Sequence, residues 1–251
     1  ESLPSGDEGP APVVSEEKDE PVGNEGWQQA KKVAGNEEKQ DPLVFVDGRI
    51  CRSDMDMSPA DGRVSFVFPD NSRYEGEVRN GLMDGSGEII FVNEDHYSGE
   101  LAKGLFHGSG RYSYGDGRIY VGTFDMGKRD GTGVFSYPDG TKYSGQFKND
   151  YFHGKGEYHF ADGSRYSGQF RNGSFNGSGT MVYVDGSVYK GSFKDDLPDG
   201  DGVLTLVNGS RYEGEFSAGK RNGHGVLTRS DGSVFKGVFE NDTFVAGPQN
   251  Q

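Results

Sequence analysis

The repeat that decides the fold is clearest in residues 143–163, which read YSGQFKNDYFHGKGEYHFADG. The stretch opens with a ring, a glycine and a second ring at every other position, and this period of two is typical of a β-strand. A glycine pair then begins a second alternating stretch. That stretch ends in Asp-Gly, a strong signal for a hairpin turn. The sequence therefore predicts one unit of strand, turn, strand and turn.

The same unit recurs along the chain with a spacing of 23 residues. The rings that open the units are Tyr74, Tyr97, Tyr120, Tyr143, Tyr166, Tyr189, Tyr212 and Phe235. A fixed period of this length indicates a repeat architecture, in which each unit packs against its neighbours in sequence. The pattern predicts an all-β fold: an elongated, twisted, single-layer antiparallel sheet of tandem β-hairpins.

The regular glycines need a physical reason, because glycine inside a strand normally weakens it. We expect each missing side chain to leave a slot in which an aromatic ring of the adjacent strand lies flat, as in some designed sheets. The rings would then form a strip on one face, and the polar residues between them would face water.

The chain divides into four segments by composition. Residues 1–42 are acidic and poor in apolar residues, so we expect a disordered tail that cannot offset the entropy of ordering. Residues 43–73 look like a decayed unit, and we interpret them as an N-terminal capping repeat, since terminal repeats are commonly atypical. Residues 74–234 hold seven full repeats, and residues 235–251 hold a final half repeat and a tail.

These units closely resemble the MORN repeat, in which aromatic-x-Gly-x-aromatic is followed by Gly-x-Gly and then Asp-Gly. The resemblance covers residues 74–247. It implies a non-enzymatic scaffold or adaptor at a cytoskeletal, ciliary or membrane-associated assembly. The expected partner is a protein, bound as a helix or an extended peptide on the aromatic face, and self-association into a homodimer is a further option.

Two alternatives follow from the same resemblance. MORN arrays precede SET-domain lysine methyltransferases and lipid kinases, so the chain could be the non-catalytic portion of a larger enzyme. Such arrays are also credited with binding phosphoinositides. The net charge of −14 argues against an anionic membrane and against nucleic acid, because both attract clusters of Lys and Arg.

Composition also limits the chemistry that the chain can carry. Its one cysteine, Cys51, excludes an internal disulfide and a cysteine-clustered zinc site, and it favours an intracellular, cytoplasmic location. His107 and His153 are two repeats apart, or about 19 Å at ~4.8 Å per strand, too far to share a metal. The glycine pairs lead into strands rather than helix N-termini, so they are not phosphate loops. We therefore expect no catalytic, cofactor or metal site.

The most informative positions are two residues just before each glycine pair, separated from its first glycine by one residue, which we expect to lie in the loop between the strands. Two units have Lys-Arg there, at 128–129 and 220–221, whereas others have rings. The rings could fold over the sheet and thicken its core. Alternatively, they are exposed anchors for a protein partner.

The anchor hypothesis names two sets of partner-binding residues. The first set is Leu105, Phe106, Tyr151, Phe152 and Phe175. The second is the ring strip of Tyr120, Phe124, Tyr143, Phe147, Tyr166 and Phe170. The hypothesis predicts that changing Phe106, Phe152 and Phe175 together to Arg preserves the fold and abolishes partner capture.

Overall fold

The computed structural model describes residues 44–46, 49–51 and 60–247. Within these ranges every regular element is a β-strand, which confirms the predicted all-β, antiparallel fold. No helix able to cross a membrane occurs in the same ranges. The predicted disordered tail, residues 1–42, lies outside the described residues.

The chain forms two compact units, which meet in sequence between Tyr151 and Phe152. A separate two-stranded sheet pairs β1 (Val44–Val46) with β2 (Arg49–Cys51). The N-terminal unit contains β3 (Gly62–Val67), β4 (Arg73–Arg79), β5 (Leu82–Ile90), β6 (His96–Ala102), β7 (Leu105–Ser113), β8 (Ile119–Asp125), β9 (Lys128–Ser136) and β10 (Lys142–Lys148). The C-terminal unit contains β11 (Tyr151–His159), β12 (Arg165–Arg171), β13 (Ser174–Val182), β14 (Val188–Lys194), β15 (Leu197–Thr205), β16 (Arg211–Ser217), β17 (Lys220–Thr228), β18 (Val234–Glu240) and β19 (Thr243–Ala246).

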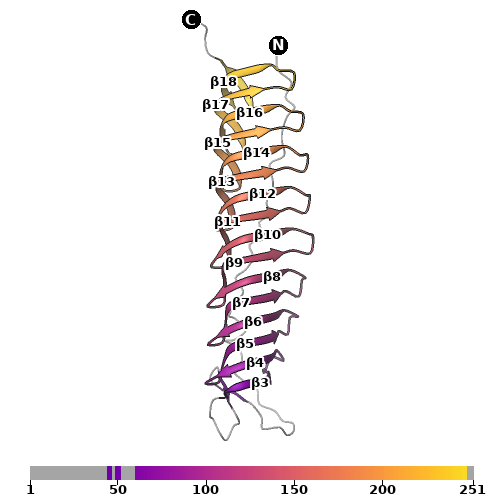
Figure 1. Cartoon of the computed structure of the whole chain (residues 1–251), viewed down its shortest axis with the longest axis vertical. Helices are drawn as coiled ribbons and strands as arrows, with labels where there is room; N and C mark the ends of the chain where they lie inside the picture. Colours follow the sequence, from indigo (N-terminus) through magenta and orange to yellow (C-terminus); the bar gives the residue numbers. More distant parts are fainter. Residues whose placement is uncertain (1–43, 47–48, 52–59, 248–251) are drawn as a thin grey trace. The chain divides into compact units, whose positions relative to one another are not determined.

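Within each unit, successive strands pair antiparallel, so each lies beside its neighbours in sequence (Figure 1). The pairing register repeats from one hairpin to the next. In β7 and β8, for example, Tyr112 pairs with Tyr120 and Gly110 pairs with Gly122. Glycine therefore faces glycine across this pair of strands, and each opening tyrosine faces a ring, as here, or an aliphatic side chain, as Tyr166 faces Met181.

The Asp-Gly hairpins have three-residue loops. At residues 114–118, the Gly117 N–H donates to the Tyr114 carbonyl at 2.9 Å, and the Tyr114 N–H donates to the Arg118 carbonyl at 2.9 Å. Gly117 has φ +92°, as the bulge position of such a loop requires. Asp116 Oδ1 accepts a hydrogen bond of 3.0 Å from the Arg118 N–H. The carboxylate thus closes the turn that the sequence predicted.

The other hairpins have two-residue loops in which both residues have positive φ, as in a type I′ turn. Asn172 (φ 51°) and Gly173 (φ 92°) form one such turn. In three loops an Asp replaces the glycine, namely Asp150, Asp196 and Asp242.

Two glycines that face each other on adjacent strands make room for the tyrosine that opens each repeat. A Cβ added at Gly168 would lie 2.6 Å from Tyr166 Cζ, and one at Gly179 would lie 2.6 Å from the same atom. The predicted slot exists, with one difference. The ring comes from the same strand as the first glycine and covers the second glycine on the adjacent strand.

The tyrosine hydroxyl fixes the ring in this slot. Tyr166 donates a hydrogen bond of 2.9 Å to the carbonyl of Gln169, next to the bulge between Gly168 and Phe170. All seven tyrosines that open a repeat make this bond, at 2.5–3.0 Å. A phenylalanine could fill the slot but could not satisfy the carbonyl.

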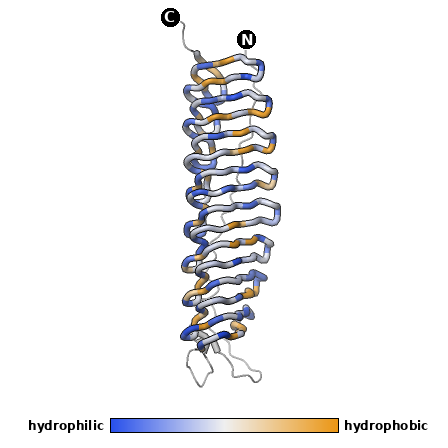
Figure 2. The backbone as a smooth tube through the Cα atoms, in the orientation of Figure 1, coloured by the Kyte–Doolittle hydropathy of each residue, from blue (hydrophilic) through white to orange (hydrophobic). Residues whose placement is uncertain are grey.

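The rings bury one another and form the core of each unit. Tyr166 stacks on Phe175 with ring centroids 3.9 Å apart, and it meets Phe193 of the next repeat edge-on at 5.0 Å. Tyr166 is 0 % exposed and Phe193 3 %. Hydrophobic residues recur in short stretches along the whole tube rather than in one block (Figure 2). Within each unit the core is thus a thin aromatic layer that links neighbouring repeats.

We predict that Gly168→Val destabilises the fold by about 1–3 kcal/mol, because the new side chain overlaps the Tyr166 ring and the backbone at Gly179. Urea unfolding followed by circular dichroism measures the change. The control is Gly163→Asn, since a Cβ at Gly163 meets nothing within 4 Å and Asn71 already takes the equivalent turn position at φ 72°. Equal stability of both variants would refute the role of the slot.

We also predict that stability falls in alkaline solution. Burial raises the pKa of Tyr183 and Tyr212 to about 12. It raises the pKa of Tyr74, Tyr97, Tyr112, Tyr120, Tyr166 and Tyr189 further. Unfolded tyrosine ionises near pH ~10, so the unfolded state loses protons first.

The stabilisation is therefore complete below about pH 10 and is lost as the pH rises above it. Urea midpoints measured from pH 8 to pH 11 should fall at the upper end. The fall should be smaller in Tyr166→Phe, which has one ionising group fewer. A midpoint that stays constant over this range would contradict the prediction.

Candidate functional site

The positions equivalent to Leu105 and Phe106, one residue ahead of each glycine pair, lie in strands, so the prediction that they lie in a loop is wrong. Leu105 and Phe106 begin β7, where they pair with Ala102 and Leu101. The turn is complete at residues 103–104, which both have positive φ. Because this turn needs only two residues, the next two already belong to the sheet.

The rings at these positions differ in exposure. Phe106 and Phe175 are 7 % and 2 % exposed, and they stack on Tyr97 and Tyr166 at 4.0 and 3.9 Å. Burial favours the core role for these two. Leu105 and Phe152 are partly exposed, and Tyr151 is 50 % exposed.

The ring strip is buried throughout. Each of its six members is at most 3 % exposed: Tyr120, Phe124, Tyr143, Phe147, Tyr166 and Phe170. A partner could touch these rings only after displacing the side chains that cover them. Partner binding at either set of residues stays a prediction.

Arg129 occupies in its repeat the place that Phe106 and Phe175 occupy in theirs. Its guanidinium lies over the ring of Phe135 at 4.9 Å and is 5.9 Å from the ring of Tyr120. The charge is matched by Asp150. Asp150 Oδ1 accepts from Arg129 Nε at 3.3 Å and from its backbone N–H at 2.9 Å, and the Asp150 carbonyl accepts from Nη2 at 2.9 Å.

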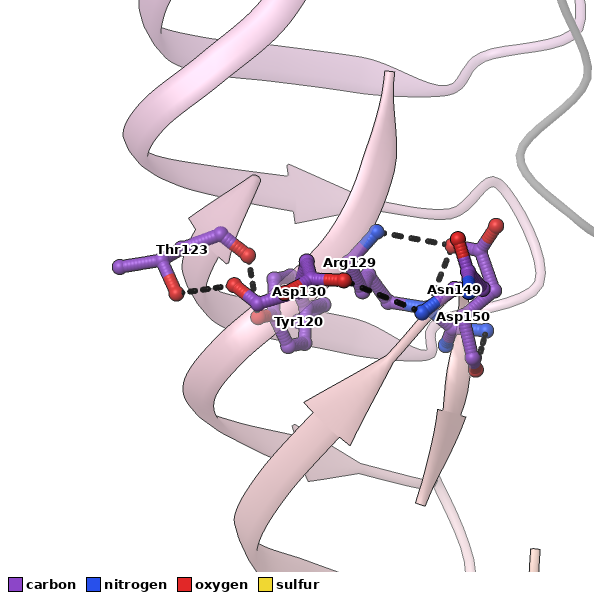
Figure 3. A network of polar contacts seen from close by, with 6 residues as sticks. All are labelled: Tyr120, Thr123, Arg129, Asp130, Asn149 and Asp150. Carbon is purple, nitrogen blue, oxygen red and sulfur yellow. Dashed lines mark hydrogen bonds and ion pairs between the residues drawn. The ribbon is translucent and has the colours of Figure 1, made fainter. Parts of the chain in front are cut away.

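Figure 3 shows how this pair connects to the backbone around it. The Asn149 N–H donates to Asp130 Oδ2 at 3.3 Å, and the Thr123 hydroxyl donates to the Asp130 carbonyl. In the C-terminal unit Arg221 and Asp242 repeat the ion pair, with Nε and Oδ1 3.1 Å apart. The ring position therefore accepts Arg where an Asp stands 21 residues later.

The repeats with Phe at the ring position differ in whether they have an Asp 21 residues later. The residue 21 positions after Phe106 is Gly127, and that after Phe152 is Gly173. After Phe175 it is Asp196, whose Oδ1 accepts from the Phe175 N–H at 2.7 Å. Burial raises the pKa of Asp196, and the negative charge of the neighbouring Asp195 adds to the rise.

This pattern corrects the expected outcome of changing Phe106, Phe152 and Phe175 together to Arg. Only the third Arg would meet a carboxylate. An unpaired cation in an aromatic layer is costly. We therefore expect the triple variant to lose its fold rather than keep it.

We predict that Phe175→Arg changes the free energy of unfolding by no more than about 1 kcal/mol, because Asp196 pairs with the new cation. Phe106→Arg should cost about 3 kcal/mol or more, since its charge is buried and unpaired. Urea unfolding of the single variants measures both. The double variant Phe106→Arg with Gly127→Asp should recover most of the loss, and failure to recover would contradict the pairing rule.

A different set of side chains forms the accessible part of the aromatic face. We call them the rim rings, each placed in a full repeat two residues before the Asp or Asn of a three-residue hairpin loop: Phe91, Tyr114, Tyr137, Phe160 and Tyr183. Phe68, at the same position ahead of the first full repeat, is buried and is not one of them. All five are partly exposed. Several rest on core rings: Phe91 lies 6.4 Å from Phe106, and Phe160 lies 6.1 Å from Phe175.

The rim rings were not among the residues predicted from the sequence to bind a partner. The available signal was their place at the end of the second alternating stretch, where the strand stops and its side chains lie near the hairpin loop. The rigid core beneath and the partial exposure make them the better candidate for contact with another molecule.

Polar side chains of the described residues offer little for chemistry. Residues 60–247 contain no group of three or more His, Cys, Asp or Glu side chains able to hold a metal. His107 Nδ1 in β7 lies 3.5 Å from Asp125 Oδ1 in β8, the next strand of the sheet. The hairpin carboxylates are engaged by backbone amides, as Asp162 is by the Ser164 N–H at 2.7 Å.

The repeats match a known family model. Seven consecutive segments match the MORN repeat, at residues 74–96, 97–117, 120–142, 143–165, 166–188, 189–211 and 212–234. The chain belongs to the MORN-repeat family. The seven repeats expected from the sequence are confirmed, and no curated protein matches this MORN-repeat chain in sequence.

Several solved structures resemble the chain in fold. The Danio rerio CPAP TCP10 domain, solved with a STIL peptide, is 18 % identical with a TM-score of 0.42, over 70 % of this chain and 79 % of that one. The Drosophila melanogaster SAS-4 TCP domain, solved with a proline-rich motif of Ana2, is 16 % identical with a TM-score of 0.39, over 63 % and 88 %. Identities this low concern fold only.

Proposed function

We propose that this MORN array is a protein-binding scaffold that uses the rim rings as its contact surface. The observation that carries the proposal is the contrast in exposure along the aromatic face. The tyrosines that open the seven full repeats are buried in the core, whereas Tyr114, Tyr137 and Tyr183 remain partly exposed at its edge.

Rings held in this way suit protein recognition. Exposed aromatic side chains on a rigid support supply much of the binding energy at protein interfaces, and they lose little entropy because they are already ordered. Phe160, for example, lies 4.7 Å from Tyr158 and 6.1 Å from Phe175. Within each unit the repeat then offers the same kind of contact at regular intervals, which suits an extended partner.

In this proposal the role is non-catalytic and intracellular. The single cysteine, Cys51, suits a reducing compartment. A cytoskeletal or ciliary setting is the finer part of the proposal and follows from the family alone.

Site-specific photo-crosslinking tests the proposal. The phenylalanine analogue p-benzoylphenylalanine replaces Tyr137 or Tyr183 in the full chain, because an aromatic replacement best preserves the packing. The control positions are Val121 and Val234, which are 46 % and 61 % exposed and lie on the opposite face of their strands. We expect protein adducts in cells from the two rim positions and few from the controls. Adducts from the controls alone would overturn the proposal.

A further inference from the structure

The C-terminal unit has an apolar row at its hairpin loops. Phe160, Tyr183 and Leu206 occupy equivalent positions in three successive repeats, and each is partly exposed. Beside the last two stand Val184 and Val207, which are 60 % and 71 % exposed. A Cβ at Gly186 would lie 4.0 Å from Val207, so the loops of neighbouring repeats are in contact range.

The spacing of this row favours one backbone conformation in a partner. Successive members are two strands apart, or about 9.6 Å at ~4.8 Å per strand. A polyproline II helix returns to the same face every three residues, or about 9.3 Å. An α-helix does so after seven residues, at about 10.5 Å, and a β-strand alternates its faces every residue. One turn of polyproline II therefore matches one repeat.

Charge at the hairpin loops favours a basic partner. Asp162 and Asp185 stand two residues after Phe160 and Tyr183, and both are exposed. The equivalent residue after Leu206 is the neutral Asn208. The next repeat has Arg229 at the ring position, with its guanidinium 4.7 Å over the ring of Phe235. Asp231, two residues after Arg229, is exposed as well, so exposed carboxylates stand at the hairpin loops of the repeats that hold Phe160, Tyr183 and Arg229.

We propose that this row binds a proline-rich segment of a partner protein that carries Arg or Lys beside its prolines. The inference rests on the proposed function and names the chemistry of the partner. Prolines would lie on Phe160, Tyr183 and Leu206, one per repeat. The basic side chains would meet Asp162 and Asp185. The preformed helix of such a segment costs little entropy to bind, which compensates for a shallow surface.

Binding of synthetic peptides to the full chain tests the inference, measured by fluorescence anisotropy. The probe is (Pro-Pro-Arg)4, which presents proline on one face and Arg on another. The comparisons are (Pro-Pro-Glu)4, (Gly-Gly-Arg)4 and an amphipathic helical peptide of the same charge. We expect the probe to bind at least tenfold more tightly than each comparison.

Variants with precedents in the chain locate the site. Asp185→Asn keeps the turn, since Asn208 accepts from the Ser210 N–H at 2.9 Å in the same way. Tyr183→Leu copies Leu206 and keeps the packing. The double variant Asp162→Asn with Asp185→Asn should weaken binding about tenfold and flatten its salt dependence, and Tyr183→Leu should weaken it severalfold. The outer-face change Val234→Ser is the control and should have no effect.

Three outcomes would overturn the inference. In the first, (Gly-Gly-Arg)4 binds as tightly as (Pro-Pro-Arg)4. In the second, the folded variants bind (Pro-Pro-Arg)4 as tightly as the unaltered chain does. In the third, the helical peptide binds more tightly than (Pro-Pro-Arg)4. Photo-adducts at Tyr137 and Tyr183 that persist in any of these cases would show that the scaffold binds a partner of different chemistry. Loss of both the adducts and the peptide binding would instead remove the proposed function itself.

Discussion

The fold depends on the placement of one tyrosine ring over two glycines. The ring needs bare backbone beneath it on its own strand and on the next, and its hydroxyl must reach the carbonyl beside the bulge, as Tyr166 reaches Gln169. These requirements fix the spacing of ring and glycine, the register of the two strands and the position of the bulge. A sheet with little apolar content thereby acquires a core within each unit, where rings such as Tyr166 also meet rings of the following repeat.

The position stacked on this tyrosine has two chemical solutions. In some repeats it is filled by a ring, as by Phe175 on Tyr166. In others it is filled by an Arg whose guanidinium lies among the rings and whose charge is met by an Asp in the next repeat's turn. A buried ion pair adds little net stability compared with a well-packed apolar group. The second solution therefore has little effect on the stability of the fold. Its main effect is on which repeats can be neighbours, because a repeat with the Arg needs a repeat with the Asp after it.

The local features were predictable from the sequence, whereas those that depend on two repeats were not. Alternation and Asp-Gly identify strands and hairpins because they reflect backbone geometry within a few residues. The loop assigned to Leu105 and Phe106 was wrong because Lys103 takes a positive φ that its residue type does not announce. The partial exposure of Tyr183 depends on which side chains of other repeats reach it. The link between Arg129 and Asp150 crosses a repeat boundary, so no single motif contains it.

That link has a consequence for how such arrays change length in evolution. Repeat proteins grow and shrink by duplication or loss of whole units, which is harmless only where the units are interchangeable. Loss of residues 143–165 would keep the 23-residue period but would bring Gly173 to the place of Asp150 and leave Arg129 facing no carboxylate. Two adjacent repeats that share such an Arg and Asp must therefore be duplicated or lost together. The order of the repeats is constrained even though each follows the same pattern.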